Sequence, residues 1–459
     1  MQINKTWVVI ACISFNIGSI SYAFVSNSMN NALKTLYIVF QISKDDQSFF
    51  AGALTSSSYV GAFFGSILTT FIKKYHTGIL IADLCLFFGS SILILGNIYT
   101  FFIGRIIAGI GCGICAVCQP VFIRQISPTS MYSSMGGILS TVFSFGYFLT
   151  MLYGVWFPTT DNITSPDQLN QYFWRIYFFV GGIPSLIRII VMKTVYNFQT
   201  PIFYIQNNQD DKALLVLQKI YQSSNYQQLL DDIREQSQTQ NKKVDFGMTI
   251  KKYRKQFYFG LFLMFIFQFC GFNAVVQYST QIFNNSKSQE TAQFLSFLIS
   301  VLKWILYSFA GTITLKYYGR RKPLLAGLSL MLIANFGIYL FSYLMNDDMI
   351  IVFIFAFVFA NFSSTGPIVP VYMPEFVPQQ LISYCYYTFW IYSIIILLIF
   401  PIAIKHLGME NCFLFFAVIT LLGVLIFYKY GVETMNKTNQ EIYQLFKKNV
   451  TDSLVQMIQ

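Results

Sequence analysis

Three cysteines with the spacing of metal ligands form one candidate chemical motif in the sequence. Cys112, Cys115 and Cys118 follow the pattern C-x2-C-x2-C, which in a soluble protein would indicate an iron–sulfur cluster. Here the run lies in an apolar, glycine-rich stretch with no fourth ligand nearby. We interpret the three residues as small side chains that pack against another helix, and we expect no cofactor and no metal.

Other reactive groups are not arranged for covalent chemistry. We find no nucleophile–base pair, no metal-ligand set and no phosphate-binding loop in a soluble setting, so we predict that the protein is not an enzyme. Arg188 and Lys303 are cations inside apolar stretches. Such a cation extends to the membrane surface or faces a wet cavity. For Lys303 we favour the surface, or a carbonyl partner; a cavity position would permit an anionic solute.

The elements that carry these residues are membrane-spanning helices. The chain has 459 residues, of which 55% are hydrophobic and 11% are charged, and its mean hydropathy is +0.54. A soluble domain has about 25% charged residues, so this chain has too few to cover a water-facing surface. Backbone groups inside lipid must be bonded internally, which favours helices of roughly 20 apolar residues. The composition therefore predicts an all-α membrane protein.

The apolar runs predict twelve transmembrane helices. We place them at 6–28, 48–72, 79–96, 99–122, 134–157, 174–196, 257–281, 293–315, 324–345, 349–373, 383–404 and 411–430. A polar stretch separates two groups of six, and we predict four parts. These are an N-terminal six-helix bundle (1–198), a cytosolic central loop (199–256), a C-terminal six-helix bundle (257–430) and a cytosolic tail (431–459). Asp210 to Tyr221 predicts a short amphipathic helix in the loop.

Lysine and arginine residues indicate the orientation. Under the twelve-span arrangement, Lys73, Arg124, Arg320 and most basic residues of the central loop and tail fall on one side, which is therefore cytosolic. The net charge of +11 is mostly this insertion signal. We expect both termini in the cytosol, the lipid bilayer of the plasma membrane as surroundings, and no nucleic-acid partner. The sequence does not determine the oligomeric state, and a monomer would suffice.

Several short motifs follow one another in a fixed order along these spans. Gly104-Arg105 opens the fourth span, and Gln268 to Asn273 lies in the seventh. Gly319-Arg320-Arg321 follows the eighth, Pro374-Glu375 ends the tenth, and Glu433-Thr434 follows the twelfth. This ordered set resembles the sugar-porter branch of the major facilitator superfamily, the family of hexose and polyol transporters, over nearly the whole chain.

The resemblance implies two pseudo-symmetric six-helix bundles that hold a substrate between them and move it by alternating access. It implies a set of substrate-binding residues: Gln268, Asn273, Tyr278, Ser140 and Trp390. It also implies a set of gating residues in a cytosolic latch: Arg105, Arg320, Arg321, Glu375 and Glu433. Amide, hydroxyl and aromatic groups suit sugar hydroxyls and ring faces. An alternative for Gln268 and Asn273 is hydrogen bonding between helices.

The two halves differ in the latch residues that the family resemblance implies. Gln125 and Gln199 stand where the family has carboxylates, whereas Arg320, Glu375 and Glu433 are kept in the second half. An unpaired charge at the membrane edge is costly, so loss of one partner favours loss of the other. We therefore expect the second half to build most of the latch.

The positions of the acidic residues bear on ion coupling. We expect no acid in the middle of a span, with Asp83 and Glu375 at helix ends. Proton-coupled members of the resembled family carry an Asp in the first span, which here reads Gly18 to Tyr22 without one. Buried ionisable groups mark proton paths, so this pattern favours facilitated diffusion (uniport). Sodium coupling through neutral oxygens stays open.

Together these features predict a transmembrane transporter for a monosaccharide or polyol. One alternative is a carrier of another small, possibly anionic organic solute. A second is a transporter-like nutrient sensor that binds a solute without moving it.

Overall fold

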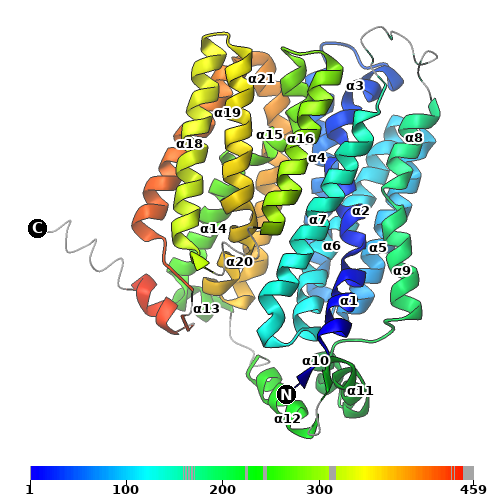
Figure 1. Ribbon diagram of the computed structural model, residues 1–459, viewed down its shortest axis with the longest axis vertical. Coiled ribbons are helices and arrows are strands. Elements are labelled where there is room, and N and C mark those ends of the chain that lie inside the picture. Colours follow the sequence, from blue (N-terminus) through cyan, green and yellow to red (C-terminus); the bar gives the residue numbers. More distant parts are fainter. Residues whose placement is uncertain are drawn as a thin grey trace, which may run out of the picture. The chain divides into compact units, whose positions relative to one another are not determined.

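Helices account for nearly all of the described chain (Figure 1). The computed structural model describes residues 2–158, 160, 163, 166, 169, 171–222, 226–240, 246–309, 317–435, 437–438 and 440–447. Residues 448–459 of the predicted tail lie outside these ranges.

The first predicted bundle contains helices that match its six apolar runs. They are α1 (Lys5–Asn16), α2 (Gly18–Asn27), α4 (Gln47–Leu68), α5 (Tyr75–Ile92), α6 (Ile98–Ile126), α7 (Tyr132–Val155), α8 (Gln171–Val180) and α9 (Ile183–Thr194). An additional helix, α3 (Met29–Val39), continues the first span beyond its predicted end at residue 28.

The second predicted bundle follows the central helices α10 (Pro201–Gln206), α11 (Asp210–Ile220), α12 (Tyr226–Gln240) and α13 (Phe246–Lys252). It contains α14 (Arg254–Phe269), α15 (Phe272–Asn284), α16 (Gln289–Phe309), α18 (Arg321–Tyr343), α19 (Asp347–Ala360), a π-helical segment η6 (Asn361–Thr365), α20 (Gly366–Phe376) and α21 (Gln379–Tyr430).

Within the described ranges, ten helical segments are long and apolar enough to cross a bilayer. The last of them contains a kink at Gly408, where φ is +83°, and this kink separates the two final spans. With α4, whose Ser and Thr residues make it less apolar, the described helices account for the twelve predicted spans. The predicted fold class is confirmed.

Contacts between residues divide the chain into two compact units. One unit comprises Met1–Ser28, Ser57–Thr150 and Asn170–Val244, and the other comprises Met29–Ser56, Met151–Leu169 and Asp245–Gln459. The second unit thus includes α3 and the first half of α4 together with the helices of the predicted C-terminal bundle. The sequence-based domain boundaries stay a prediction.

The central loop is attached to the N-terminal segment by a short backbone pairing. Strand β1 (Gln2–Ile3) pairs antiparallel with β2 (Tyr221–Gln222), and the N–H of Asn4 donates to the carbonyl of Ile220 at 3.0 Å. Helix α11 ends next to β2 and buries Ala213, Val216, Leu217 and Ile220. The predicted helix is present as α11, and it contacts α1 (Figure 1).

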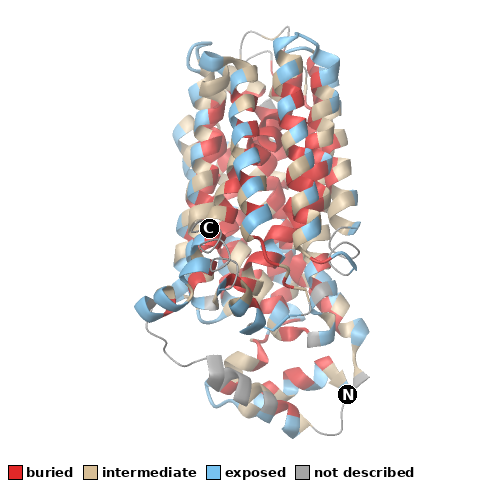
Figure 2. Cartoon of the chain, turned by 90° about the vertical axis from the view of Figure 1, so that its left-hand side faces the viewer, coloured by how far each residue is buried: buried red, intermediate tan, exposed pale blue. Residues whose placement is uncertain are grey.

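Burial follows the pattern of a protein in lipid. Figure 2 shows buried residues along the interior faces of the helices and exposed residues on their outer faces. Large apolar side chains such as Phe88 and Ile333 are exposed, as expected where hydrocarbon replaces water. The three cysteines of the C-x2-C-x2-C run are buried in α6.

Glycines on α6 allow α4 to approach closely. A Cβ on Gly109 would overlap the backbone of Ser58, and one on Gly113 would overlap the backbone of Ala62. Small residues permit such contacts between helices in a membrane. The glycine face of α6, the fourth predicted span, therefore packs against α4, the second predicted span.

Replacing Gly109 by Ala should push α4 away from α6 and destabilise the protein by about 1–3 kcal/mol, as overpacking does. Gly136→Ala in α7 is a matched control, because a Cβ there would meet nothing within 4 Å. That control should stabilise the helix by up to about 1 kcal/mol. Thermal unfolding of the purified protein in detergent measures both changes, and equal effects would contradict the close α4–α6 contact.

Candidate functional site

The seventh span is broken between α14 and α15. Gly271 lies at the break with φ +94°, and a Cβ there would collide with the ring of Phe416. The break leaves carbonyl groups without helical partners. The Nδ2 of Asn335, from α18, donates to the carbonyl of Cys270 at 3.0 Å and to Oγ1 of Thr420 at 3.3 Å. These side chains provide the partner that a broken helix needs in lipid.

Two predicted binding residues lie on either side of the break. The Nδ2 of Asn273 donates to Oε1 of Gln268 at 2.7 Å and to Oγ of Ser393, on α21, at 3.3 Å. Gln268 is fully buried, and its Nε2 has no hydrogen-bond partner among the described residues. Burying an amide N–H without an acceptor costs about 1–3 kcal/mol. A buried donor without a partner is a candidate contact for a ligand hydroxyl, and the Asn273–Ser393 contact links α15 to α21.

An aromatic wall adjoins this amide pair. The ring of Phe267 lies 5.4 Å from that of Phe272 and 5.9 Å from that of Phe389, and Phe389 lies 5.1 Å from Trp390. Phe272 in turn lies 6.3 Å from Phe362 of η6. Trp390 is thus joined to the Gln268 region through Phe389. Such rings can stack on the apolar face of a sugar.

Tyr278 lies further along α15, at a residue with non-helical backbone angles. Its hydroxyl donates to the carbonyl of Leu397 at 2.7 Å and lies 3.3 Å from the carbonyl of Ala51. It also lines a cavity of about 440 Å³, together with Tyr37 and Gln281. The structure therefore places Tyr278 at the wall of this cavity, with its hydroxyl engaged by backbone.

A polar cluster that the sequence analysis did not identify joins α3 to α15. The Nδ2 of Asn30 donates to Oγ of Ser279 at 2.7 Å, and the N–H of Thr280 donates to Oδ1 of Asn30 at 3.0 Å. The Oγ1 of Thr280 donates to Oδ1 of Asn31 at 2.9 Å. All these side chains are buried. The paired asparagines directly after an apolar span were the available signal, but their partners are distant in sequence.

Ser140 belongs to the other unit. It lies on α7, is half-buried, and its hydroxyl donates to the carbonyl of Gly136 on the same helix.

Four of the predicted latch residues are joined by one ion pair and by hydrogen bonds to a second carboxylate. The guanidinium of Arg320 binds the Glu375 carboxylate at 2.7 Å. Glu433 accepts the backbone N–H groups of Arg320 and Arg321, both at 2.9 Å. The hydroxyl of Thr434 donates to Glu375 at 2.5 Å. Arg321 joins through this backbone bond, while its side chain donates to the carbonyl of Tyr428.

The surroundings of Glu433 keep it ionised. Burial acts to raise the pKa of the Glu433 carboxyl, but four backbone N–H groups, including those of Met435 and Thr434, together hold that pKa below its ordinary value. A lowered pKa means that the carboxylate and its bonds persist at neutral pH and are lost only when the pH falls below the usual range of Glu.

Arg105 is placed differently from the other latch residues. It is fully buried near the start of α6, about 28 Å along the helix from Arg124 at 1.5 Å per residue. Its guanidinium donates to the carbonyl of Val25 and to the hydroxyls of Ser28 and Ser58. Arg105 thus lies at the opposite end of α6 from Arg124, on which the predicted cytosolic side rests, and its place in a cytosolic latch stays a prediction.

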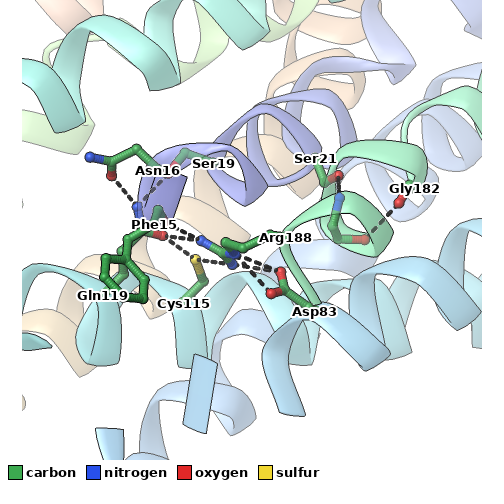
Figure 3. Close-up of polar contacts among 10 residues, drawn as sticks. Phe15, Asn16, Ser19, Ser21, Asp83, Cys115, Gln119, Gly182 and Arg188 are labelled. Atoms are coloured by element: carbon green, nitrogen blue, oxygen red, sulfur yellow. Dashed lines mark hydrogen bonds and ion pairs between the residues drawn. The ribbon is translucent and has the colours of Figure 1, made fainter. Parts of the chain in front are cut away.

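The expectation that no acid lies in mid-span is wrong. Helix α5 begins at Tyr75, four residues before the predicted start, so Asp83 lies two turns inside it and is fully buried. Arg188 of α9 binds its carboxylate, with Nη2 at 2.6 Å from Oδ1 and Nε at 2.8 Å from Oδ2 (Figure 3). Arg188 is thus an ion-pair partner and does not extend to the membrane surface.

The other donors of Arg188 are also engaged. Its Nη1 donates to the carbonyl of Phe15 at 2.9 Å and to Oε1 of Gln119 at 2.8 Å. Nε2 of Gln119 then donates to Asn16 and, at 2.7 Å, to Ser19 (Figure 3). The pair thereby ties α5 and α9 to the first span and to α6.

We expect Asp83→Asn to leave Arg188 as an uncompensated buried charge and to destabilise the protein by about 3–5 kcal/mol. The double variant Asp83→Asn/Arg188→Gln removes both charges and should recover part of that loss. Thermal unfolding in detergent measures both variants. A single variant as stable as the unmodified protein would show that the ion pair does not stabilise this unit.

Comparisons with known proteins find relatives along nearly the whole chain. The sugar (and other) transporter family matches residues 7–446. Hexose transporter 1 of Plasmodium vivax (strain Brazil I) is 23% identical over 451 residues, covering 92% of this chain and 88% of that protein. The major myo-inositol transporter IolT of Bacillus subtilis (strain 168) is 22% identical over 448 residues, covering 94% and 92%.

A solved structure has the same fold. The proton:xylose symporter XylE of E. coli, bound to 6-bromo-6-deoxy-D-glucose, matches with a TM-score of 0.81 at 19% identity. The match covers 96% of this chain and all of that one. At this level of identity the match concerns the fold alone, and that fold is the one predicted from the sequence.

Proposed function

Since the chain belongs to the sugar (and other) transporter family of the major facilitator superfamily, we propose that it moves a monosaccharide or polyol across a bilayer by uniport. As a family member it is a multi-pass membrane protein and a sugar transporter, not an enzyme. The names of its relatives, a hexose transporter and a myo-inositol transporter, support neutral polyhydroxylated solutes as the substrate class.

The buried amide pair carries the proposal. A sugar hydroxyl is both a donor and an acceptor, and Gln268 offers an N–H that nothing in the described protein accepts. Asn273 orients Gln268 through a 2.7 Å bond, and the adjoining rings suit the face of a pyranose. Binding at a helix break lets backbone and side chains meet the solute without exposing unsatisfied groups to lipid.

Alternating access requires a gate on each side. The buried Asn30–Ser279 and Asn31–Thr280 bonds between α3 and α15 are suited to an outer gate, because breaking them would separate those two helices. The Arg320–Glu375–Glu433 cluster is suited to a cytosolic latch. Its residues all come from the second half of the chain. Arg105 is left out of this latch.

Uniport is supported by the state of Asp83. Its carboxylate is bound by two nitrogens of Arg188, and protonating it would strand a buried cation at considerable cost. The first span also lacks an acid. A proton carrier would need a carboxyl that gains and loses its proton during each cycle. The basic loops support cytosolic termini; we place the protein in the plasma membrane, where a monomer is sufficient.

Uptake of labelled D-glucose, D-xylose and myo-inositol into liposomes that contain the purified protein tests this function. We expect saturable uptake of at least one solute, with the same initial rate with and without a proton gradient. Gln268→Leu should lower the apparent affinity about 10- to 100-fold, since it removes buried hydrogen bonds to the solute. Gln380→Leu, on the exposed end of α21, is the control. Uptake that requires a proton gradient would contradict uniport.

The latch makes a separate prediction. Arg320→Ala or Glu375→Ala should favour the state open to the cytosol and lower the apparent affinity for external solute by about tenfold, as loss of a partly buried charged hydrogen bond does. Lys322→Ala is the matched control, because Lys322 is exposed beside the latch. Unchanged kinetics for both variants, measured by influx and efflux from the same liposomes, would exclude the latch.

A further inference from the structure

The buried face of α16 is polar along most of its length. Its buried residues recur every three or four positions and include Gln289, Gln293, Ser296, Ser300 and Lys303. Hydrocarbon disfavours such a stripe unless it faces protein or a solute path.

Partners along this stripe come from the same unit. Oε1 of Gln289 accepts the N–H and the hydroxyl of Thr160, both at 3.0 Å. Ser296 lies 2.9 Å from Thr280 in the proposed outer gate. The stripe therefore runs beside the gate and ends at Lys303.

Lys303 is a buried cation between aromatic rings. It is 4% exposed, and its Nζ lies 5.6 Å from the ring centroid of Phe362 and 5.7 Å from that of Tyr307. The ring faces offset part of the cost of burying the charge. The expectation that this lysine extends to the surface is wrong, because the side chain is buried inside the unit; a carbonyl partner, which was favoured alongside it, stays a prediction.

The wall opposite Lys303 is built on a π-helical segment. Segments of this kind are frequent at functional sites, because they displace side chains from the regular helical positions. Asn361 opens η6, and its Oδ1 is buried with no hydrogen-bond partner among the described residues. A Cβ on Gly366 would meet both the hydroxyl of Tyr307 and, at 3.1 Å, this Oδ1. A cation, a hydroxyl and an unfilled acceptor thus belong to one cluster.

This cluster adjoins the amide pair. Phe362 lies 6.3 Å from Phe272, the residue directly before Asn273. One aromatic wall therefore leads from Gln268 and Asn273 to Lys303, all within the same unit.

We propose that Lys303, Tyr307, Asn361 and Phe362 form a subsite for the carboxylate of a sugar acid, so that the transporter accepts uronic or aldonic acids as well as neutral sugars. This rests on the proposed function, in which Gln268 and Asn273 hold the hydroxyl-bearing part. The ammonium of Lys303 would donate to the carboxylate, and Asn361 would accept from a neighbouring hydroxyl. One lysine neutralises one negative charge. A phosphate dianion would leave a second charge buried, which is costly.

Uptake of labelled D-glucuronate, D-glucose and D-glucose 6-phosphate into liposomes tests the subsite. The variants are Lys303→Met, which keeps the length of the side chain without its charge, and Lys287→Met in the loop before α16. We expect the unmodified protein to carry glucuronate and glucose. Lys303→Met should lose glucuronate uptake by at least about tenfold, the effect of one charged hydrogen bond, while glucose uptake stays within about threefold. Lys287→Met should carry both.

The unmodified protein also provides a test that does not depend on folding of a variant. Glucuronate should compete with glucose uptake in it. Glucose uptake with neither transport of glucuronate nor competition by it would overturn the subsite and leave the proposed function intact. Glucuronate uptake without any neutral sugar uptake would overturn the neutral-sugar function and support the subsite. Equal losses of both solutes in Lys303→Met, preferred uptake of the phosphate, or no uptake of any solute would overturn the subsite.

Discussion

Every polar group within the hydrocarbon must find its partner inside the protein, and this constraint accounts for most of the unusual features of the structure. Where a helix breaks at Gly271, Asn335 from another helix bonds to the carbonyl of Cys270. Where a carboxylate is buried, Arg188 binds it with two nitrogens. In both places the partner comes from another helix. The hydrogen bonds that satisfy the polar group therefore also fix how the helices of the unit pack.

The same constraint makes a buried polar group without a partner a candidate for solute binding when it lies beside a suitable wall of side chains. The charges of Asp83 and Arg188 are matched within a closed network, which suits a permanent support. Gln268 and Asn361 are buried, yet one amide donor and one amide acceptor have no partner among the described residues. Both adjoin the aromatic wall that extends from Phe267 to Phe362. A solute with hydroxyl groups can satisfy them, which is why this part of the second unit is the proposed binding site.

The sequence predicted the features that depend on local composition. Apolar runs gave the spans, and the spacing of Leu and Ile gave α11 to within one residue of its end. The sequence did not predict burial or contacts that depend on residues far away in the chain. Asp83 can lie buried within α5 because Arg188, which is 105 residues away in the sequence, offsets the cost of burying its charge. The Asn30–Ser279 bond joins residues 249 apart, and the π-helical turn at Asn361 has no sequence pattern that predicts it. The candidate binding residues came from the resemblance to a known family, whereas the unpartnered donor of Gln268 is visible only in the structure.

In the proposed function, the unpartnered Nε2 of the buried Gln268 donates a hydrogen bond to a hydroxyl of the sugar. Equilibrium binding of D-glucose and its monodeoxy analogues to the purified protein, with and without Gln268→Leu, tests it as a double cycle. We predict that removal of one particular hydroxyl weakens binding to the unmodified protein about tenfold, which matches one lost buried hydrogen bond. The same removal should have little effect on the variant. Equal losses in both proteins for every hydroxyl would contradict the account.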